Sequence, residues 1–262
     1  MTQLSIIVPV YNVENYIRPC IESIFNQGLD ESCFEVIIVN DGTEDKSMEM
    51  IADIIKIHNT ITVINQDNQG VSVARNNGIE AAKGQYVLII DSDDLLNENS
   101  LKPILEIANR TQADMVVADY LIMTNDEIKD FKPIYQENFT VREMSGEQFL
   151  EEELNPHACY IWHILFKREF ITNEKIRFYP GIRYQDVPFI HECYLKAKRC
   201  LEISWLLNIY RKWPGVSTSS FDMKKAKDFS IAISKTWDLT KLKGLSQSAG
   251  FKYAKTYGHP FV

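Results

Sequence analysis

The 262-residue sequence has an ordinary globular composition, with 45% hydrophobic and 24% charged residues, and it can form one large domain or one domain with an appendage. Its formal net charge is −8, from 36 acidic residues against 28 Lys and Arg. This balance argues against broad binding to nucleic-acid backbones, which requires clustered positive charge.

Strands and helices alternate over the first 90 residues. Each predicted strand is a short apolar run of the kind that is buried on both faces, and each predicted helix has apolar residues at a spacing of three to four. This alternation predicts an α/β fold with a right-handed, mostly parallel sheet covered by helices on both faces. The strands are predicted at 4–11, 34–40, 60–64 and 86–90, and the helices at 12–27, 46–58 and 70–82.

Polar residues follow three of these strands: Tyr11-Asn12, Asp41-Gly42-Thr43 and Asp91-Ser92-Asp93. The carboxyl ends of parallel strands meet at one edge of a sheet, where such folds bind ligands, so these residues predict a nucleotide pocket. The sequence has neither a Gly-x-Gly-x-x-Gly fingerprint nor a P-loop to hold phosphates. Asp91 and Asp93 at alternating positions can instead bind Mg²⁺ or Mn²⁺, which prefer oxygen ligands. The alternative is a solvated acidic turn that caps the next helix.

The pattern is looser beyond residue 95. A helix is predicted at 99–108, a strand at 113–123, a hairpin within 126–141, and a helix start at Ser145, whose cap is completed by Gln148. The aromatic-rich stretch 161–168 is predicted as a helix or strand lining the second half of the cleft, although core packing is favoured for Trp162 and Leu165. The remaining elements are predicted as a helix at 188–197, a strand at 206–210, a polar basic loop at 211–219 and a helix at 223–242.

Asp186 comes just before the helix predicted at 188–197. An aspartate at this place is either an N-cap or a catalytic acid, and the residues around it favour the cap.

We expect one large domain at 1–220, with the predicted nucleotide pocket in its first half, 1–120, and a C-terminal helical extension at 221–262. Basic residues dominate the last part, including Lys224, Lys225, Lys227, Lys241 and Lys243. They indicate either contact with anionic lipid or a solvated helix face.

Five cysteines without a Cys-x-x-Cys pair, and scattered histidines, predict a reducing compartment and no zinc site. The N-terminus lacks a basic signal-peptide region, and no apolar run approaches the roughly 18 residues of a membrane span. We therefore expect a cytoplasmic protein whose membrane contact, if any, is peripheral at the inner face.

Four motifs occur in order along the sequence: 5–12 (SIIVPVYN), 39–45 (VNDGTED), 68–78 (NQGVSVARNNG) and 91–94 (DSDD). Together they resemble the family 2 glycosyltransferases of the GT-A fold, closely over about the first 120 residues and more loosely to about residue 219. The resemblance implies an inverting enzyme that uses a nucleotide-diphosphate sugar, most often UDP-linked, with Mg²⁺ or Mn²⁺. It also implies that 1–220 is the catalytic domain, with a nucleotide-sugar half at 1–120 and an acceptor half at 121–220.

The resemblance also implies roles for individual residues. Pro9 and Tyr11 border the base, Asp41 accepts a hydrogen bond from the uracil ring, and Arg75 supports the base and the diphosphate. Asp91 lies near the ribose, Asp93 ligates the metal with Asp91, and Asp186 is the general base. The nucleotide-sugar site also includes Glu14, Ser92 and Arg211, the last in a segment that closes over the diphosphate. Gln185 stands where the family has Glu, which weakens the assignment of Asp186.

Three alternatives remain. An aspartyl phosphatase has a similar Asp-x-Asp, but on its first strand. A sugar nucleotidyltransferase shares the architecture, but its glycine-rich loop is missing after residue 11. A non-catalytic nucleotide-sugar-binding domain is compatible with Gln185. The donor sugar and the oligomeric state are not readable, and cell-surface polysaccharide or lipid-linked oligosaccharide is the expected acceptor.

Overall fold

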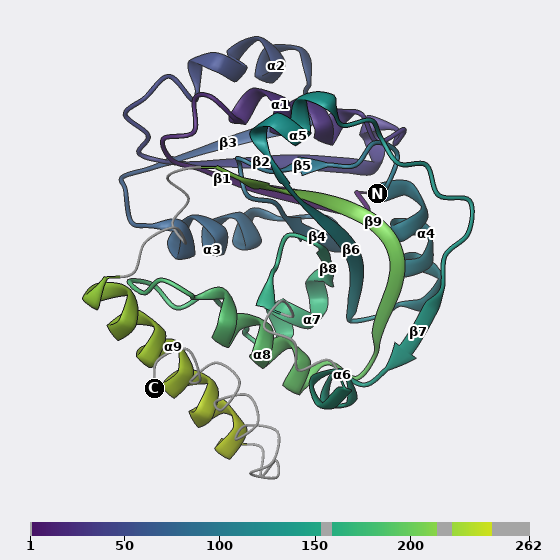
Figure 1. Cartoon of the computed structure of the whole chain (residues 1–262), viewed down its shortest axis with the longest axis vertical. Helices are drawn as coiled ribbons and strands as arrows, with labels where there is room; N and C mark the ends of the chain where they lie inside the picture. The colour runs from purple at the N-terminus through teal and green to yellow at the C-terminus, as the bar shows by residue number, and fades with distance from the viewer. Residues whose placement is uncertain (1, 153–158, 214–221, 243–262) are drawn as a thin grey trace.

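A computed structural model describes residues 2–152, 159–213 and 222–242 (Figure 1). Its first part alternates strands and helices, as the sequence predicts. The elements are β1 (Leu4–Val10), α1 (Ile17–Phe25), β2 (Phe34–Asp41), α2 (Ala52–Ile57), β3 (Ile61–Gln66), α3 (Val71–Ala81) and β4 (Tyr86–Ile89).

The four strands pair in parallel in the order β3-β2-β1-β4. All seven residues of β1 are buried, because this strand lies between β2 and β4 and has helices against both faces. In the register, Ile7 lies opposite both Ile37 and Ile89, so the three strands end at the same edge. The predicted parallel sheet and its common edge are confirmed.

The second part of the chain changes the sheet from parallel to mixed. β8 pairs antiparallel with both β4 and β6, while β9 runs parallel to β6 and antiparallel to β5 and β7. All pairs among the first four strands are parallel, as is the long pair β6–β9, whereas the pairs made by β5, β7 and β8 are antiparallel. The elements are β5 (Leu95–Leu96), α4 (Leu101–Thr111), β6 (Met115–Thr124), α5 (Asn125–Asp130), β7 (Val141–Met144), α6 (Gly146–Glu152), β8 (Ile164–Lys167), α7 (Arg168–Asn173), α8 (Asp186–Lys196), β9 (Cys200–Lys212) and α9 (Met223–Leu242).

Three predicted elements differ from the structure: one is of the wrong type, one was predicted too short and one too long. The expected hairpin at 126–141 is instead helix α5 followed by an irregular segment and β7. A capping box at Thr124 and Glu127, whose side chains each bond the other's backbone N–H, begins that helix. β9 begins at Cys200 rather than 206, because its first residues pair with β6 and β7. α1 begins at Ile17, after a loop that forms part of the site.

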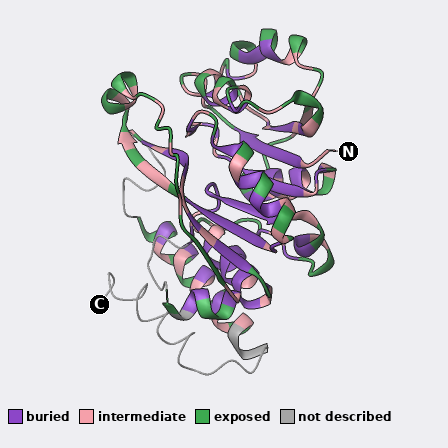
Figure 2. Cartoon of the chain, turned by 90° about the vertical axis from the view of Figure 1, so that its right-hand side faces the viewer, coloured by how far each residue is buried: buried purple, intermediate pink, exposed green. Residues whose placement is uncertain are grey.

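Two hydrophobic layers lie on opposite faces of the sheet. Leu4, Ile6, Val8 and Val10 of β1 pack into the layer that contains α1 and α4, and Ile7 packs into the layer that contains α3 and α8. In Figure 1, α1 and α2 cover one side of β1–β3 and α3 covers the other. β1 and β4 are fully buried and β2 is nearly so (Figure 2). Burial on both faces explains why these strands appear in the sequence as unbroken apolar runs.

Helix α3 lies unusually close to the sheet at Gly78. A Cβ at this position would collide with the side chain of Ile7 on β1. The absence of a side chain therefore sets the distance between the sheet and α3, the helix that carries Arg75.

Hydrogen bonds from α3 also hold the segment that leads to α8. The Asn76 side chain bonds both the N–H and the C=O of Phe178 at 2.9 Å, and the Ser72 hydroxyl donates to the C=O of Tyr179 at 2.9 Å. α9 packs against α8, and its start is tied to the same segment by an ion pair between Arg183 and Asp222 at 3.2 Å. No helix in the described ranges is long and apolar enough to cross a membrane.

Candidate active site

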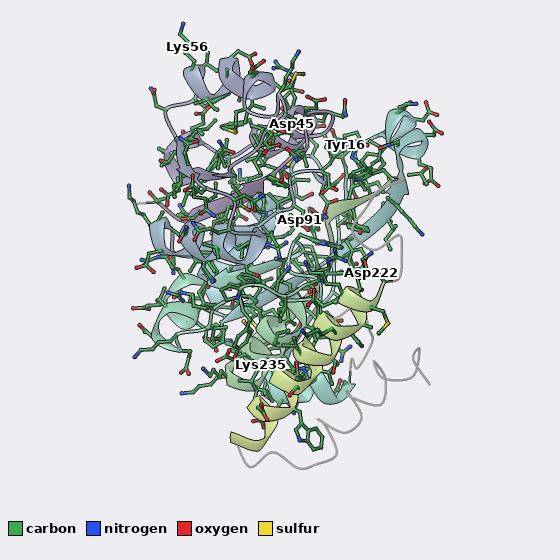
Figure 3. All side chains as sticks on the ribbon, turned by 90° about the vertical axis from the view of Figure 1, so that its left-hand side faces the viewer. Tyr16, Asp45, Lys56, Asp91, Asp222 and Lys235 are labelled. Atoms are coloured by element: carbon green, nitrogen blue, oxygen red, sulfur yellow. The ribbon has the colours of Figure 1, made fainter. Side chains whose placement is uncertain are left out.

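A cleft of about 770 Å³ opens where β1, β2 and β4 end. Figure 3 places Asp91 between the levels of Asp45, in the N-terminal part, and Asp222, before α9. Eight of the ten predicted site residues line this cleft: Pro9, Tyr11, Asp41, Arg75, Asp91, Ser92, Asp93 and Asp186. Glu14 and Arg211 are not among its lining residues.

Asp41 fixes the loop at the end of β2. Its Oδ1 accepts hydrogen bonds from the Gln66 side chain at 2.7 Å and the Gln69 N–H at 2.8 Å, and its Oδ2 accepts from the Gly70 N–H at 2.9 Å. The carboxylate is buried, so these donors compensate for its lost hydration. Asp41 thereby shapes the start of α3, and it lines the cleft beside Tyr11, whose side chain is 44% exposed.

Arg75 connects the two walls of the cleft. One guanidinium nitrogen pairs with Asp91 Oδ1 at 2.5 Å, and the other donates to Gln185 Oε1 at 2.9 Å. The guanidinium also lies 5.3 Å from the centre of the Phe178 ring. Arg75 is buried, and Asp91 is the one carboxylate that pairs with it in the described ranges, so its charge acts strongly on the groups around it.

The turn after β4 holds three carboxylates. Asp91 is bonded to Arg75, and Asp93 Oδ2 accepts from the Trp213 indole N–H at 2.9 Å. Asp94 points away from the cleft and is fully buried, where it accepts from the Arg211 backbone N–H at 2.9 Å and the Asn208 side chain at 3.2 Å. Burial raises the pKa of Asp94 well above its usual range, and the charges of Asp91 and Asp93 raise it further.

Arg211 holds the turn after β4 in place through hydrogen bonds. Its Nε donates to the backbone C=O of Asp93 at 2.7 Å, and its Nη1 donates to the Asn125 side chain at 3.0 Å. The Tyr16 ring lies against both Arg211, at 5.1 Å, and Trp213, at 4.9 Å. Arg211 thus positions Asp93, whereas Trp213 lines the cleft. The rest of the predicted closing loop, 214–219, lies outside the described residues.

Asp186 is the first residue of α8 and lies half-buried in the cleft. Asp186 is not the N-cap of α8, which was the alternative prediction. Gln185 occupies the cap position, and its side chain makes no cap bond. Burial raises the pKa of Asp186 to about 6, although the nearby charge of Arg75 and the N–H groups of Asp186 and Val187 oppose the rise. A carboxylate with this pKa is a proton acceptor near neutral pH.

Glu14 lies outside the cleft in the loop after β1. Its carboxylate accepts from the Lys46 N–H at 3.0 Å, and its own N–H donates to Asp45 at 2.9 Å. These bonds join the loop after β1 to the loop after β2. Glu14 can therefore influence a ligand only through the shape of these loops.

The stretch 161–168 was predicted to line the second half of the cleft, and Ile161 and Trp162 do line it. Trp162, for which core packing was favoured, is only 2% exposed and also backs the cleft wall. Tyr210 and Trp213, which line the cleft as well, fall in the segment that the resemblance places over the diphosphate. Tyr160 and Tyr184 are lining residues that were not predicted.

The carboxylates of the turn fit a divalent cation. Asp91 Oδ2 and Asp93 Oδ1 make no hydrogen bond to another residue in the described part of the chain, whereas the second oxygen of each is bonded. Burial and the charge of Asp91 raise the pKa of Asp93, and a bound cation would relieve both. No group of three or more metal-ligating side chains occurs in the described ranges. Two carboxylates suit Mg²⁺, which commonly takes its other ligands from water and substrate phosphates.

Comparisons with known proteins agree with this arrangement. Residues 5–171 match the model of glycosyl transferase family 2. The uncharacterized glycosyltransferase EpsJ of Bacillus subtilis is 36% identical over 228 residues, covering 86% of this chain and 65% of EpsJ. The poly(ribitol-phosphate) beta-glucosyltransferase of Bacillus spizizenii is 28% identical over 75% of this chain and 30% of its own length. The chain thus spans less than two thirds of either relative.

Among solved structures, Staphylococcus aureus TarS 1–349 in complex with UDP-GlcNAc superposes with a TM-score of 0.80. The alignment covers 99% of this chain and 73% of that one, at 20% sequence identity. It confirms the predicted GT-A fold.

Proposed function

Because this chain belongs to glycosyl transferase family 2, we propose that it transfers a sugar from a nucleotide-diphosphate sugar, UDP-linked in the simplest case, to an acceptor hydroxyl with inversion. The observation that carries the proposal is one cleft that joins two carboxylates suited to a cation and a third suited to a proton. Arg75, which bonds both Asp91 and Gln185, links the two groups.

The donor occupies the wall formed by the ends of β1, β2 and β4 in this proposal. Pro9 and Tyr11 border the base, Asp41 accepts from its ring N–H, and Arg75 faces the diphosphate. Asp41 retains acceptor capacity for this bond, because a carboxylate offers about four lone-pair sites and three are used. Ser92 lines the same wall. Glu14 and Arg211 act indirectly, by shaping the loops and the aspartate turn.

Asp93 and Asp91 would hold Mg²⁺ or Mn²⁺ through their unbonded oxygens. When bound, the cation stabilises the negative charge that develops on the departing nucleoside diphosphate. Trp213 donates to the other oxygen of Asp93, which leaves the first oxygen oriented toward the cleft for a ligand.

Asp186 acts as the general base. Its carboxylate takes the proton of the acceptor hydroxyl as the hydroxyl oxygen bonds to the anomeric carbon of the donor. The bond from that carbon to the phosphate oxygen breaks, and its electron pair leaves with the diphosphate. One displacement without a covalent intermediate inverts the configuration. A positioned base of this kind contributes about 10²–10⁴-fold in rate.

The remaining features of the enzyme follow from the same proposal. Residues 1–220 form the catalytic domain and 221–262 an extension, and the acceptor is a saccharide or a lipid-linked saccharide of a cell-surface polymer. No nucleic acid takes part. Exposed basic residues of the extension such as Lys227 contact the inner face of the membrane from the cytoplasm in this proposal, whereas Lys224 lines the cleft and Lys225 is buried. Lys241 and Lys243 lie where side chains are not described.

Two measurements on the purified chain test this function. Thermal shift with a panel of nucleotide sugars, with and without Mn²⁺, should give a selective, metal-dependent stabilisation by one donor. Release of the nucleoside diphosphate in the presence of acceptors should then reveal turnover. Binding without turnover across a broad acceptor panel would favour the non-catalytic alternative, and the absence of any nucleotide-dependent shift would contradict the proposal.

A further inference from the structure

Three aromatic side chains form one wall of the cleft beside Asp186. Trp162 stacks on Tyr160 with ring centroids 4.8 Å apart and on Tyr210 at 5.3 Å, and the planes differ by only 18° and 9°. Tyr160 and Tyr210 are themselves 6.0 Å apart, with planes 19° apart. All three residues line the cleft.

These distances define how the rings are arranged. In a column of three stacked rings, the outer centroids would be at least about 7 Å apart, because each aromatic layer is about 3.5 Å thick. The 6.0 Å between Tyr160 and Tyr210 is too short for such a column. The two tyrosines therefore lie side by side on one face of Trp162.

Burial shows which layer faces the cleft. Trp162 is 2% exposed, whereas Tyr160 and Tyr210 are half-buried, so the indole is the backing layer and the tyrosines form the surface. Tyr120 of β6 packs edge-on against Trp162 at 4.8 Å and Tyr160 at 5.7 Å, which holds the layer from the side. The result is a flat and rigid aromatic surface built from segments 50 residues apart.

From this geometry we propose that Tyr160 and Tyr210, backed by Trp162, bind the pyranose ring of the acceptor. We call these three residues the aromatic platform. The inference rests on the proposed function and adds the class of acceptor. The sugar that receives the transferred group is a ring sugar, not an open-chain polyol phosphate.

The position of the platform assigns it to the acceptor. Tyr160, Tyr210 and Asp186 line the same cleft. Burial raises the pKa of the Tyr160 hydroxyl, and the charge of Asp186 raises it further, in agreement with this placement. A hydroxyl that gives its proton to Asp186 belongs to a molecule that rests beside that residue, whereas the donor diphosphate is assigned to Arg75, Asp91 and Asp93.

The chemistry of the platform favours a ring sugar. A pyranose presents an apolar C–H face that matches the electron-rich face of an aromatic ring, and its hydroxyl edge remains free to reach Asp186. An open-chain polyol phosphate has no such face. Its negative charge would also lie near Asp186 and Asp91. Of the three cations that line the cleft, Arg75 is paired with Asp91 and Arg183 with Asp222, so a polyol phosphate would have to rely on Lys224.

The test compares leucine and phenylalanine at the platform tyrosines. Tyr160→Leu and Tyr210→Leu remove the aromatic face but keep apolar volume, whereas Tyr160→Phe and Tyr210→Phe keep the ring. Tyr135→Leu is the matched control, because Tyr135 is 68% exposed and outside the cleft. Each protein is assayed with p-nitrophenyl pyranosides of the common hexoses and N-acetylhexosamines, and with ribitol phosphate and glycerol phosphate oligomers. Donor affinity is measured separately by calorimetry without acceptor.

We expect transfer to at least one pyranoside, with an acceptor KM raised about tenfold or more by each leucine change. This is the scale of losing one ring-stacking contact, which is worth about 1–3 kcal/mol for a nucleic-acid base. The phenylalanine variants should keep most of the acceptor affinity, and donor affinity should change less than twofold in all variants.

Two results would overturn the platform while leaving the proposed function intact. They are transfer to polyol phosphates only, and leucine variants whose acceptor KM equals that of the phenylalanine variants. Donor binding without transfer to any acceptor of the panel would count against both the platform and the proposed function. Failure of the wild-type chain to bind any nucleotide sugar would overturn the proposed function itself, and the platform with it.

Discussion

The two walls of the cleft hold their carboxylates in opposite ways. On the donor wall, Asp91 and Asp93 follow one another in a short turn, and each has one oxygen bonded to a fixed donor and one without a partner in the described structure. On the acceptor wall, Asp186 stands alone at the start of α8, and only the charge of Arg75 and two backbone N–H groups counter its burial.

This difference separates two functions that sequence motifs alone do not distinguish. Paired, oriented carboxylates with free oxygens suit a cation that remains bound during the reaction. A single carboxylate whose pKa is raised suits a proton that arrives and leaves. Arg75 lies between them, so a change at either wall alters the charge balance at the other.

The strongest test of the acceptor wall is Asp186→Asn. The amide keeps the shape of the side chain but cannot take a proton, so we expect turnover to fall by about 10²–10⁴-fold. Donor affinity, measured by calorimetry with Mn²⁺ present, should stay near that of the wild type. A variant that turned over at the wild-type rate would remove Asp186 from the mechanism.

The corresponding test of the donor wall is Asp93→Asn. The amide oxygen can still accept from Trp213, but the loss of charge weakens the cation site, and we expect nucleotide affinity in Mn²⁺ to fall by roughly a hundredfold or more, toward its metal-free value. Calorimetric titration of UDP with Mn²⁺ and with EDTA measures this. Equal metal dependence in the variant and the wild type would show that the cation binds elsewhere.

The pH dependence of the wild-type enzyme tests the raised pKa. Asp186 accepts a proton only when ionised, and its pKa lies at about 6. The value of kcat/KM should therefore be level above this pH and fall about tenfold per unit below it, since activity is lost as the carboxylate becomes protonated. An acid limb near pH 4 would mean that Asp186 has the pKa of an ordinary exposed carboxyl.

A smaller effect is expected from Gln185→Glu. The new carboxylate would share Arg75 with Asp91 and lie next to Asp186, so it would raise the pKa of Asp186 by repulsion. The acid limb should shift to higher pH, with a loss of about a few-fold at pH 7 and little change in kcat well above the limb. Gln185→Met, which has no charge, is the control. An unshifted limb would show that the two walls are not electrostatically coupled.

The sequence predicted the donor wall well because its signals are local. Apolar strands that end in Tyr11, Asp41 and Asp91 define a sheet edge without knowledge of distant contacts. Asp94 was missed because its role depends on β9, more than 110 residues away, which supplies Asn208 and Arg211. No local pattern distinguishes it from its two neighbours.

The acceptor wall was less predictable for the same reason. Tyr160 and Tyr210 meet only because β8 enters the sheet antiparallel between β4 and β6, and β9 joins beyond it. Such strand order arises from packing across the whole domain rather than from periodicity. The error at 126–141 has a different cause, because its signal was local. The Thr-x-x-Glu pattern of Thr124 and Glu127 indicates the start of a helix, and the structure has α5 there instead of the expected hairpin.

Gly78 shows that a residue without a functional group can be essential to the site. Gly78 bonds no ligand and carries no charge, so a survey of functional groups would rank its replacement as harmless. Yet even an added methyl would push α3 away from Ile7, and Arg75, one turn earlier, would move with the helix. The most damaging inherited change could therefore occur at a residue that takes no part in the reaction, and it would look like a defect in catalysis rather than in packing.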